Sequence, residues 1–404
     1  MHIAIIGGGA AGFFSAIRAK ETHPQSHVVI FEKKNRLLSK VQISGGGRCN
    51  VTNACPTIDA LCDAYPRGGR SLKKLFHRFS NHDAMEWFRE RGVPLVVQDD
   101  DCVFPRSQDA QSIVDVLLNE ARKHQVEIRK NTPVTALKPA GSQWQVVVAQ
   151  DQDHPALFDK VIVTTGGSPR KAGLEWLETQ GHKIEPPVPS LFTFHMPKEP
   201  VTRLAGIVAD HARAGIQGTK FRSGGPLLIT HWGMSGPAIL KLSSYAARHL
   251  SEVGYHFTLQ VNWTGETGRE QVAATLAELA QTHPRKMLAN IRPFNLPERL
   301  WLYLLDKCGL PPDKKWGETG RKGLNKLANH LINDEYTVSG KATHKDEFVT
   351  CGGVSLKSVD LKTMQSKVCP NLYFAGEVLD IDAITGGFNF QAAWSTGFVA
   401  GELG

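Results

Sequence analysis

The chain opens with two short apolar runs on either side of a helical pattern. Residues 2–6 are apolar and β-branched, which is typical of a strand buried in a parallel sheet. A helical stretch is expected over residues 10–20, and a second apolar run, residues 28–31, ends at Glu32. The order strand, helix, strand predicts a βαβ unit at the N-terminus.

Two later segments repeat the pattern of a buried strand that ends at small residues. Residues 160–163 run into a Thr-Thr-Gly-Gly turn, and residues 371–375 run into Gly376 and Glu377. A helical stretch over residues 392–401, rich in Ala, Ser and Gly, closes the chain. The pattern predicts an α/β fold with a Rossmann-like dinucleotide-binding domain.

The middle of the chain has a different pattern. A proline-rich stretch at residues 185–189 is stiff and forms a natural domain boundary. Short alternating runs follow, which favour antiparallel strands or a small barrel, and then a helical pattern with apolar stripes. We expect a discontinuous dinucleotide-binding domain with an insertion: residues 1–189 and 346–404 for the domain, 190–265 and about 334–345 for the β part, and 266–333 for the helical part.

Composition fits a globular protein of two or three domains. With 404 residues, 41% hydrophobic and 21% charged, the chain is neither disordered nor collagen-like nor a coiled coil. The seven cysteines form no CxxC pair, so we expect reduced thiols and no metal site. No apolar run is long enough to span a membrane, and together these features predict a cytoplasmic protein.

A glycine turn between the first strand and helix is the first motif that carries chemistry. Gly7, Gly9 and Gly12 match GxGxxG, and Glu32 stands 20 residues after Gly12. The glycines permit a tight turn, close approach of a pyrophosphate and close helix packing. The helix N-terminus can bind phosphates, and the acid can accept hydrogen bonds from a ribose. The motif favours a bound dinucleotide over an empty turn but does not separate NAD from FAD.

A second glycine cluster follows at residues 44–47, Ser-Gly-Gly-Gly. Three adjacent glycines have high conformational entropy, and they have little use unless the backbone must approach a ligand closely. The alternative is a flexible surface loop. Polar residues follow the cluster and favour the first interpretation: Arg48, Asn50, Thr52 and Asn53.

The C-terminal segment resembles the second FAD-binding segment of two-dinucleotide-binding-domain flavoproteins. The residues that carry the resemblance are Ala375-Gly376-Glu377 and Gly386-Gly387 before the last helix. In those proteins the acid binds a ribityl hydroxyl, and the final helix points its N-terminus at the flavin. Glu377 stands where many relatives have Asp. The resemblance favours FAD over NAD.

The stretch Ser44 to Asn53 matches the signature SGGGRCNxTN of a bacterial flavoprotein family. The chain resembles this family, which includes BaiN-like and aminoacetone-oxidase-like FAD-dependent oxidoreductases and a ribosomal RNA dihydrouridine synthase. Residues 103–107, 228–237, 350–356 and 375–380 carry further blocks of the resemblance, so it spans nearly the whole chain. A local departure is Leu38-Ser39-Lys40, where relatives often have Gly-Arg-Lys.

The resemblance implies a Rossmann-like FAD-binding domain with an inserted β-barrel and helical subdomain over the flavin. Together with the motifs, it gives a set of expected FAD-contacting residues, in which Lys40 would serve the phosphates. They are Gly7, Gly9, Ala10, Ala11, Gly12, Glu32, Lys33, Lys40, Ser44, Gly45, Gly46, Gly47, Arg48, Asn50, Thr52, Val134, Thr165, Gly166, Gly376, Glu377, Gly387, Phe388, Asn389 and Gln391.

Positive charge is concentrated in two segments. The whole chain carries +8, while residues 284–330 hold ten basic and four acidic residues and residues 67–91 hold seven basic and three acidic ones. Trp301, Tyr303 and Trp316 are interleaved with the first set. Lys and Arg contact phosphates and aromatics can stack on unpaired bases, so this segment is a candidate site for ribosomal RNA. The alternative is a solvated helical face whose aromatics belong to the core.

The favoured reaction is reduction of a polarised C=C bond by FAD, with NAD(P)H as a transient electron donor, because the chain has no second complete GxGxxG. Uridine in ribosomal RNA is the more specific expectation. Cys49 and His231 are the candidate proton donors; the alternatives are a packing role for Cys49 and a turn-stabilising role for His231.

Three other functions stay open: a small-molecule ene reductase, an amine oxidase that passes electrons to O₂, and a non-enzymatic FAD-containing RNA-binding factor. The sequence decides neither the physiological substrate, nor NADH against NADPH, nor the oligomeric state.

Overall fold

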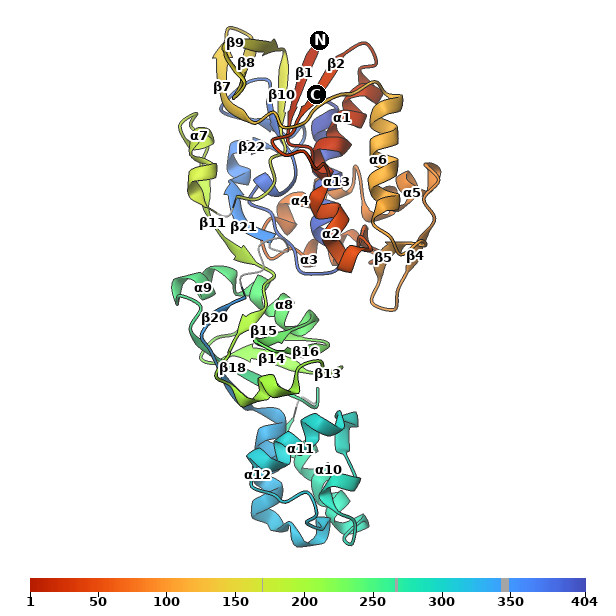
Figure 1. Cartoon of the computed structure of the whole chain (residues 1–404), viewed down its shortest axis with the longest axis vertical. Helices are drawn as coiled ribbons and strands as arrows, with labels where there is room; N and C mark the ends of the chain where they lie inside the picture. Colours follow the sequence, from red (N-terminus) through yellow and green to blue (C-terminus); the bar gives the residue numbers. More distant parts are fainter. Residues whose placement is uncertain (169, 266–267, 343–348) are drawn as a thin grey trace. The chain divides into compact units, whose positions relative to one another are not determined.

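A computed structural model of the chain describes residues 1–168, 170–265, 268–342 and 349–404. The chain forms two compact units (Figure 1). The first unit combines Met1–Ser190 with Lys345–Gly404, and the second comprises Leu191–His344. The second unit is therefore inserted in the sequence of the first.

The core of the first unit is a seven-stranded sheet in the order β22-β23-β24-β10-β1-β2-β6. Strands β24, β10, β1, β2 and β6 pair in parallel, and β22 and β23 add an antiparallel edge. The expected strands lie at its centre and are almost fully buried, which explains their unbroken apolar runs. This core confirms the α/β fold. The strands are β1 (His2–Ile6), β2 (His27–Phe31), β6 (Glu127–Arg129), β10 (Lys160–Val163), β22 (Val359–Asp360), β23 (Gln365–Ser366) and β24 (Leu372–Phe374).

The first and last helices of the chain, α1 (Ala10–Thr22) and α13 (Phe388–Gly401), pack directly on each other (Figure 1). A Cβ atom at Gly397 would lie 2.9 Å from the carbonyl oxygen of Ala11, and one at Gly401 would lie 2.6 Å from that of Ser15. Only glycine permits this approach. Ala11 precedes Ser15 in α1, just as their partners Gly397 and Gly401 follow each other in α13. The two helices therefore run in the same direction, and their N-termini face the same side.

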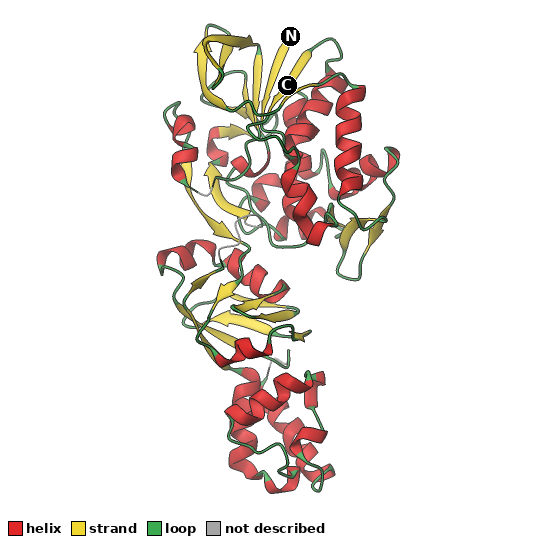
Figure 2. Cartoon of the chain, in the orientation of Figure 1, coloured by secondary structure: helices red, strands yellow, loops and turns green. Residues whose placement is uncertain are grey.

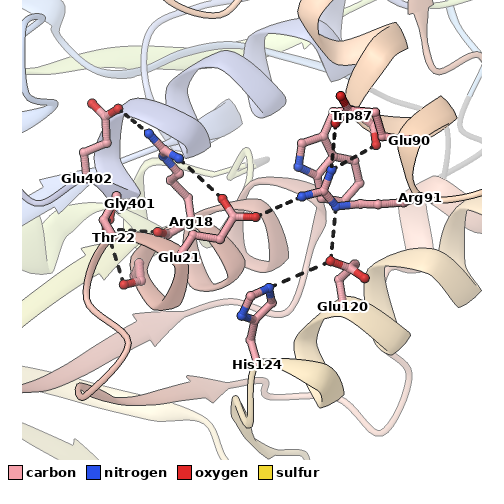
Figure 3. Close-up of polar contacts among 11 residues, drawn as sticks. Arg18, Glu21, Thr22, Trp87, Glu90, Arg91, Glu120, His124, Gly401 and Glu402 are labelled. Carbon is pink, nitrogen blue, oxygen red and sulfur yellow. Dashed lines mark hydrogen bonds and ion pairs between the residues drawn. The ribbon is translucent and has the colours of Figure 1, made fainter.

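Ion pairs fix the outer end of α1 to its neighbours (Figure 3). Arg18 contacts Glu402, just beyond α13, at 2.9 Å between Nη2 and Oε1. Glu21 accepts a hydrogen bond from Arg91 at 2.9 Å, and Arg91 also reaches Glu120 at 3.1 Å. These half-buried pairs join α1, the end of α5 (Asn81–Glu90) and α6 (Gln111–Lys123).

Smaller elements complete the first unit (Figure 2). Two three-stranded antiparallel sheets and one strand pair surround the core. Their strands are β3 (Thr52–Asn53), β4 (Leu95–Val97), β5 (Cys102–Pro105), β7 (Val134–Ala140), β8 (Gln143–Val148), β9 (Asp151–Phe158), β11 (Ile184–Ser190) and β21 (Val349–Val354). The remaining helices are α2 (Ser39–Gly47), α3 (Ile58–Asp63), α4 (Gly69–Phe76) and α7 (Glu175–Glu178).

The β part of the second unit consists of two sheets of antiparallel strands, as the short alternating runs predict. Their orders are β13-β16-β17-β12-β20 and β15-β14-β18-β19. The strands are β12 (Phe194–His195), β13 (Val208–Ala209), β14 (Arg213–Ile216), β15 (Arg222–Gly224), β16 (Leu227–Thr230), β17 (Gly233–Ser235), β18 (Phe257–Asn262), β19 (Asp334–Val338) and β20 (Gly340–Lys341). Helices α8 (Pro237–Tyr245) and α9 (Ala247–Glu252) belong to this part.

The helical part follows as α10 (Arg269–Thr282), α11 (Glu298–Lys307) and α12 (Gly320–Ile332), where α12 packs on both of the others. A buried carboxylate, Asp334, joins this part to the sheet. It accepts hydrogen bonds from Trp263 Nε1 at 3.0 Å and from the Tyr336 hydroxyl, and it pairs with Lys307 of α11 at 2.5 Å. Burial alone would raise the pKa of Asp334, but hydrogen bonds from His330 and Lys307 and the charge of Lys307 hold it below its usual value.

The Asp334 cluster yields a stability prediction. We expect Asp334→Ala to lower the free energy of unfolding by about 3–5 kcal/mol, because the Lys307 ammonium and the buried donor groups lose their shared acceptor. Urea denaturation followed by circular dichroism measures this loss. The matched control is Glu335→Ala, because Glu335 is the next residue of β19 and is exposed. We expect the control to change the unfolding free energy by about 1 kcal/mol or less, and equal losses for both variants would contradict the assigned role of Asp334.

Candidate dinucleotide site

The glycine turn after β1 combines two tightly packed glycines with one open one. Gly7 has φ +119°, and a Cβ atom there would lie 2.4 Å from the carbonyl oxygen of Thr164. A Cβ atom at Gly12 would lie 2.0 Å from the carbonyl oxygen of Gly7. By contrast, no atom lies within 4 Å of the corresponding point at Gly9. Packing thus requires glycine at Gly7 and Gly12, while Gly9 leaves its backbone open to a ligand.

The N-terminus of α1 has the properties of an anion site. Gly9 is the N-cap, no side chain caps the helix, and its first turn holds no acid. The short side chains of Ala10 and Ala11 leave the N–H groups of this turn accessible. The free N–H groups and the positive end of a 13-residue helix suit a pyrophosphate.

Glu32 lies at the end of β2, directly beside this turn. Its Oε2 accepts a hydrogen bond from the Gly8 N–H, and its Oε1 accepts one from the Lys34 N–H, both at 2.8 Å. The backbone of Thr132, just before Val134 at the start of β7, donates to the Glu32 carbonyl at 2.8 Å. Glu32 and Val134 therefore belong to the same region, where the sequence predicts the adenosine side. Lys33 is exposed.

The glycine cluster forms a left-handed turn at the end of α2. Gly45, Gly46 and Gly47 have φ values of +58°, +70° and +84°, which L side chains adopt with strain. No atom lies within 4 Å of a Cβ at Gly46 or Gly47. The Ser44 hydroxyl donates back to the Val41 carbonyl at 2.9 Å. The expected loop is thus a kinked helix end whose glycine backbone is uncovered, as a ligand cradle requires.

Arg48 holds this turn in place from outside. Its guanidinium stacks on the Phe104 ring at 4.2 Å and donates to the Gln108 side chain at 3.3 Å. The Ala110 N–H donates to the Gly47 carbonyl at 2.9 Å. These contacts give the Arg48 side chain a positioning role at the turn, and its expected contact with the cofactor stays a prediction. The sequence reasoning gave Phe104 no role, although it lies in a block that carries the family resemblance.

A second uncapped helix N-terminus lies next to the glycine cluster. Gly387, with φ +87°, is the N-cap of α13, and a Cβ there would lie 2.4 Å from the Thr52 carbonyl oxygen. The Thr52 hydroxyl donates to Gln391 Oε1 at 2.7 Å, and both side chains are fully buried. The Tyr65 hydroxyl donates to the Phe388 carbonyl at 2.6 Å. These contacts brace the start of the helix, and the expected contact of Thr52 and Gln391 with FAD stays a prediction.

Asn50 and Asn389 also serve the N-terminus of α13. The Asn50 side chain accepts a hydrogen bond from the Gly387 N–H at 3.2 Å and donates to the Thr52 carbonyl at 2.8 Å. Asn389 exchanges hydrogen bonds with the backbone of Ala383 at 3.0 and 3.2 Å. Both amides stabilise the backbone around the helix start, and their expected contact with the cofactor stays a prediction.

Between the two helix N-termini lies a charged pair. Lys40 Nζ contacts Glu377 Oε2 at 2.5 Å, and Glu377 Oε1 accepts from the Thr350 N–H at 2.8 Å. A Cβ at Gly376 would lie 2.8 Å from Ala11 Cβ, which places this segment against the start of α1. Lys40 therefore pairs with the acid expected to bind the ribityl chain, in a segment that lies against the start of α1. Its expected role on the phosphate side stays a prediction. Thr350, which sequence reasoning missed as a site residue, holds the acid.

Gly166 extends the open surface of the cradle on the β10 side. It has φ +75° and no atom within 4 Å of a Cβ position, while Thr165 before it is exposed. The open glycines, two helix N-termini and the Lys40–Glu377 pair form one connected set. From Phe388 to Gly397, where α13 meets the start of α1, the helix advances roughly 14 Å. The chemistry of these groups suits the phosphates and ribityl chain of a dinucleotide.

The two expected proton donors lie in different units. Cys49 is 0% exposed, and burial raises the pKa of its thiol to about 12. This burial favours the alternative packing role of Cys49 over its expected role as a proton donor, which stays a prediction. His231 is exposed on the turn between β16 and β17 of the second unit.

Within the described ranges, no three His, Cys, Asp or Glu side chains gather into a metal site. No helix of the described chain is long and apolar enough to cross a membrane.

Comparison with known proteins identifies the family. The HI0933-like protein Rossmann domain matches residues 1–403. The chain is 29% identical over 411 residues to the 3-dehydro-bile acid delta(4,6)-reductase of Clostridium scindens, covering 99% of this chain and 98% of the relative. It is 29% identical over 415 residues to the ribosomal RNA dihydrouridine synthase of Escherichia coli, covering 98% of this chain and 96% of the relative. These matches confirm the resemblance seen in the glycine-rich signature.

Solved structures support the same fold at low sequence identity. The Escherichia coli quinol fumarate reductase FrdA is 12% identical with a TM-score of 0.50, covering 100% of this chain and 69% of that one. The 3-ketosteroid delta1-dehydrogenase of Sterolibacterium denitrificans is 11% identical with a TM-score of 0.50, covering 99% of this chain and 98% of that one. The family match over residues 1–403 shows that this chain belongs to the HI0933-like family of Rossmann-domain proteins and is an FAD-dependent oxidoreductase.

Proposed function

We propose that the protein reduces a C=C bond with electrons from NAD(P)H. The observation that carries this proposal is the open glycine cradle between two uncapped helix N-termini, which suits FAD. Bound FAD would supply hydride transfer from the nicotinamide to the substrate. The reaction balances as NAD(P)H, one proton and the C=C bond giving NAD(P)⁺ and the saturated bond.

The residues of the cradle have separate tasks in this proposal. Gly9 and the start of α1 would hold the pyrophosphate, and Glu32 would bind the adenosine ribose. Glu377 would hold the ribityl chain, with Lys40 and Thr350 orienting its carboxylate. The start of α13 would place its positive end where negative charge develops on reduction. A nicotinamide dinucleotide would bind transiently, since the sequence has no second complete GxGxxG.

Uridine in ribosomal RNA is the substrate we propose. Two relatives, from Escherichia coli and Haemophilus influenzae, are ribosomal RNA dihydrouridine synthases, and the net charge of +6 over residues 284–330 suits a polyanionic substrate. A small unsaturated substrate, as in the bile acid reductase, is the second candidate because that relative matches over the same length. An enzyme acting on ribosomal RNA would work in the cytoplasm.

His231 is the remaining candidate for the proton donor. An exposed imidazole can exchange protons with water and approach a substrate, whereas the buried Cys49 thiol cannot. In this role, His231 would protonate the carbon next to the one that receives the hydride.

The glycine cradle can be tested by one substitution. We expect Gly46→Val to lower the FAD content of the purified protein on the order of tenfold, because the side chain fills the open space and strains a residue with φ +70°. Flavin absorbance per protein measures this. Gly141→Val is the matched control, since Gly141 has φ +64°, open surroundings and a place in the turn between β7 and β8. Equal FAD loss in both variants would refute the cradle.

The electron donor separates the proposed reductase from its rivals. We expect NADPH or NADH to bleach the bound flavin under anaerobic conditions, and aminoacetone to leave it oxidised. Stopped-flow absorbance with each compound measures this. Rapid bleaching by aminoacetone alone, with peroxide release in air, would instead establish an amine oxidase. If no compound bleaches the flavin, a non-enzymatic FAD-containing RNA-binding factor becomes the better description.

The proposed substrate is tested in cells. We expect a strain lacking this gene to lose dihydrouridine from its ribosomal RNA, because no other step would saturate the target uridine. Mass spectrometry of nucleosides from purified ribosomal RNA measures the loss, and re-expression of the intact gene is the control. Unchanged dihydrouridine, with NAD(P)H still bleaching the flavin, would redirect the search to small unsaturated molecules.

A further inference from the structure

Two strand-like segments of the helical part lie side by side and bring basic residues together. Met287 and Lys315 form an antiparallel bridge. The Leu288 N–H donates to the Lys314 carbonyl at 2.8 Å, and the Trp316 N–H donates to the Lys286 carbonyl at 2.9 Å. The chain then turns into α12, whose first residues after Gly320 are Arg321 and Lys322. We call this group the bridge patch; it comprises Arg285, Lys286, Lys314, Lys315, Arg321 and Lys322.

The bridge patch carries little compensating negative charge. Lys314 is partly exposed, the other five residues are exposed, and Lys315 alone forms an ion pair in the described structure, with Glu318 at 3.4 Å. Two of the cations occupy the first turn of α12, which holds no acid, so they face the positive end of the helix. That arrangement is unfavourable by itself. An anion bound at the patch would relieve this repulsion.

Other cations of residues 284–330 are engaged elsewhere. Arg292 pairs with Glu298 at 3.0 Å, Arg299 donates to the Arg203 carbonyl at 3.0 Å, and Lys307 pairs with the buried Asp334. Arg299, whose partner is a neutral carbonyl, and the exposed Lys326 also lie outside the patch. The other six of the ten cations in the segment form the bridge patch.

The aromatic residues of the segment are not available for stacking on bases. Trp301 and Trp316 are both 0% exposed and stack on each other with ring centroids 6.2 Å apart. Tyr303 is partly buried next to Tyr336, and burial raises the pKa of Tyr303 to about 12. Trp301 and Trp316 therefore belong to the core and cannot stack on unpaired bases, while Tyr303 is partly buried.

We propose that the bridge patch binds the phosphate backbone of double-helical RNA. This inference rests on the proposed function for its choice of RNA as the polyanion. Cations without accessible aromatics recognise phosphate density and not bases. A duplex presents phosphates more densely than a single strand, so a helical stem next to the target fits the patch better than an unpaired loop.

The test compares two triple variants of the FAD-loaded, full-length protein. Lys286→Gln/Lys314→Gln/Lys322→Gln removes three charges from the patch. Lys130→Gln/Lys138→Gln/Lys362→Gln removes three exposed charges from the first unit and is the matched control. The probes are an RNA hairpin with a stem of about 16 base pairs, an oligouridylate with equally many phosphates, and poly-glutamate of equal charge. Fluorescence anisotropy over roughly 50–200 mM salt gives the affinities.

We expect wild-type protein to bind the hairpin more tightly than the oligouridylate. The patch variant should lose about tenfold or more in affinity at low salt, and its slope of log K against log salt should fall by about three. The control triple should bind like wild type. Equal losses in both triples, or tighter binding of the oligouridylate, overturn the proposal. Tighter binding of poly-glutamate assigns the patch to an acidic protein and also overturns it.

Two further measurements keep the result interpretable. Arg285→Gln/Arg321→Gln tests the same patch through different side chains if the lysine triple does not fold. Anaerobic bleaching by NADPH without RNA is measured on each variant. In the patch variants, NADPH should bleach the flavin as it does in wild type. Loss of RNA binding with normal bleaching concerns the patch alone, whereas absence of bleaching in wild type contradicts the proposed reductase.

Discussion

The close approach of α1 and α13 is the constraint on which the rest of the first unit depends. Gly397 and Gly401 bring the backbones together at distances where any other residue would collide with Ala11 or Ser15. Because both helices run in the same direction, their uncapped N-termini open toward one side. The N-terminal and C-terminal segments of the chain thus form one cradle together. The ion pairs of Arg18, Glu21 and Arg91 fix the C-terminal end of α1 to its neighbours.

Inside the cradle, the open surface is backbone and the side chains around it are mostly braces. Arg48 stacks on Phe104, Thr52 bonds to Gln391, and Asn50 bonds to the start of α13. This division has a physical reason. A left-handed glycine turn loses much conformational entropy on folding and needs several fixed contacts to persist. Polar side chains near a ligand can therefore be essential to binding without touching the ligand.

In the second unit, too, the side chains that stabilise the fold differ from those that are exposed for binding. Trp301 and Trp316 pack inside, and Asp334 joins the helical part to the sheet. The exposed cations of the bridge patch take no part in these buried contacts. A surface whose charge is not used for stability is free to serve binding, which is why a loss of affinity without a loss of stability is the informative outcome there.

The sequence by itself determined the α/β class, the glycine turn at Gly7 to Gly12 and the acid at Glu32, because these depend on local periodicity and on residues close in the chain. Only the tertiary structure decided which polar residues contact each other across hundreds of residues. It paired Lys40 with Glu377, buried Cys49, and turned Arg48 and Gln391 into braces. Burial and partner choice depend on how distant segments pack, so a residue type and its spacing cannot reveal them.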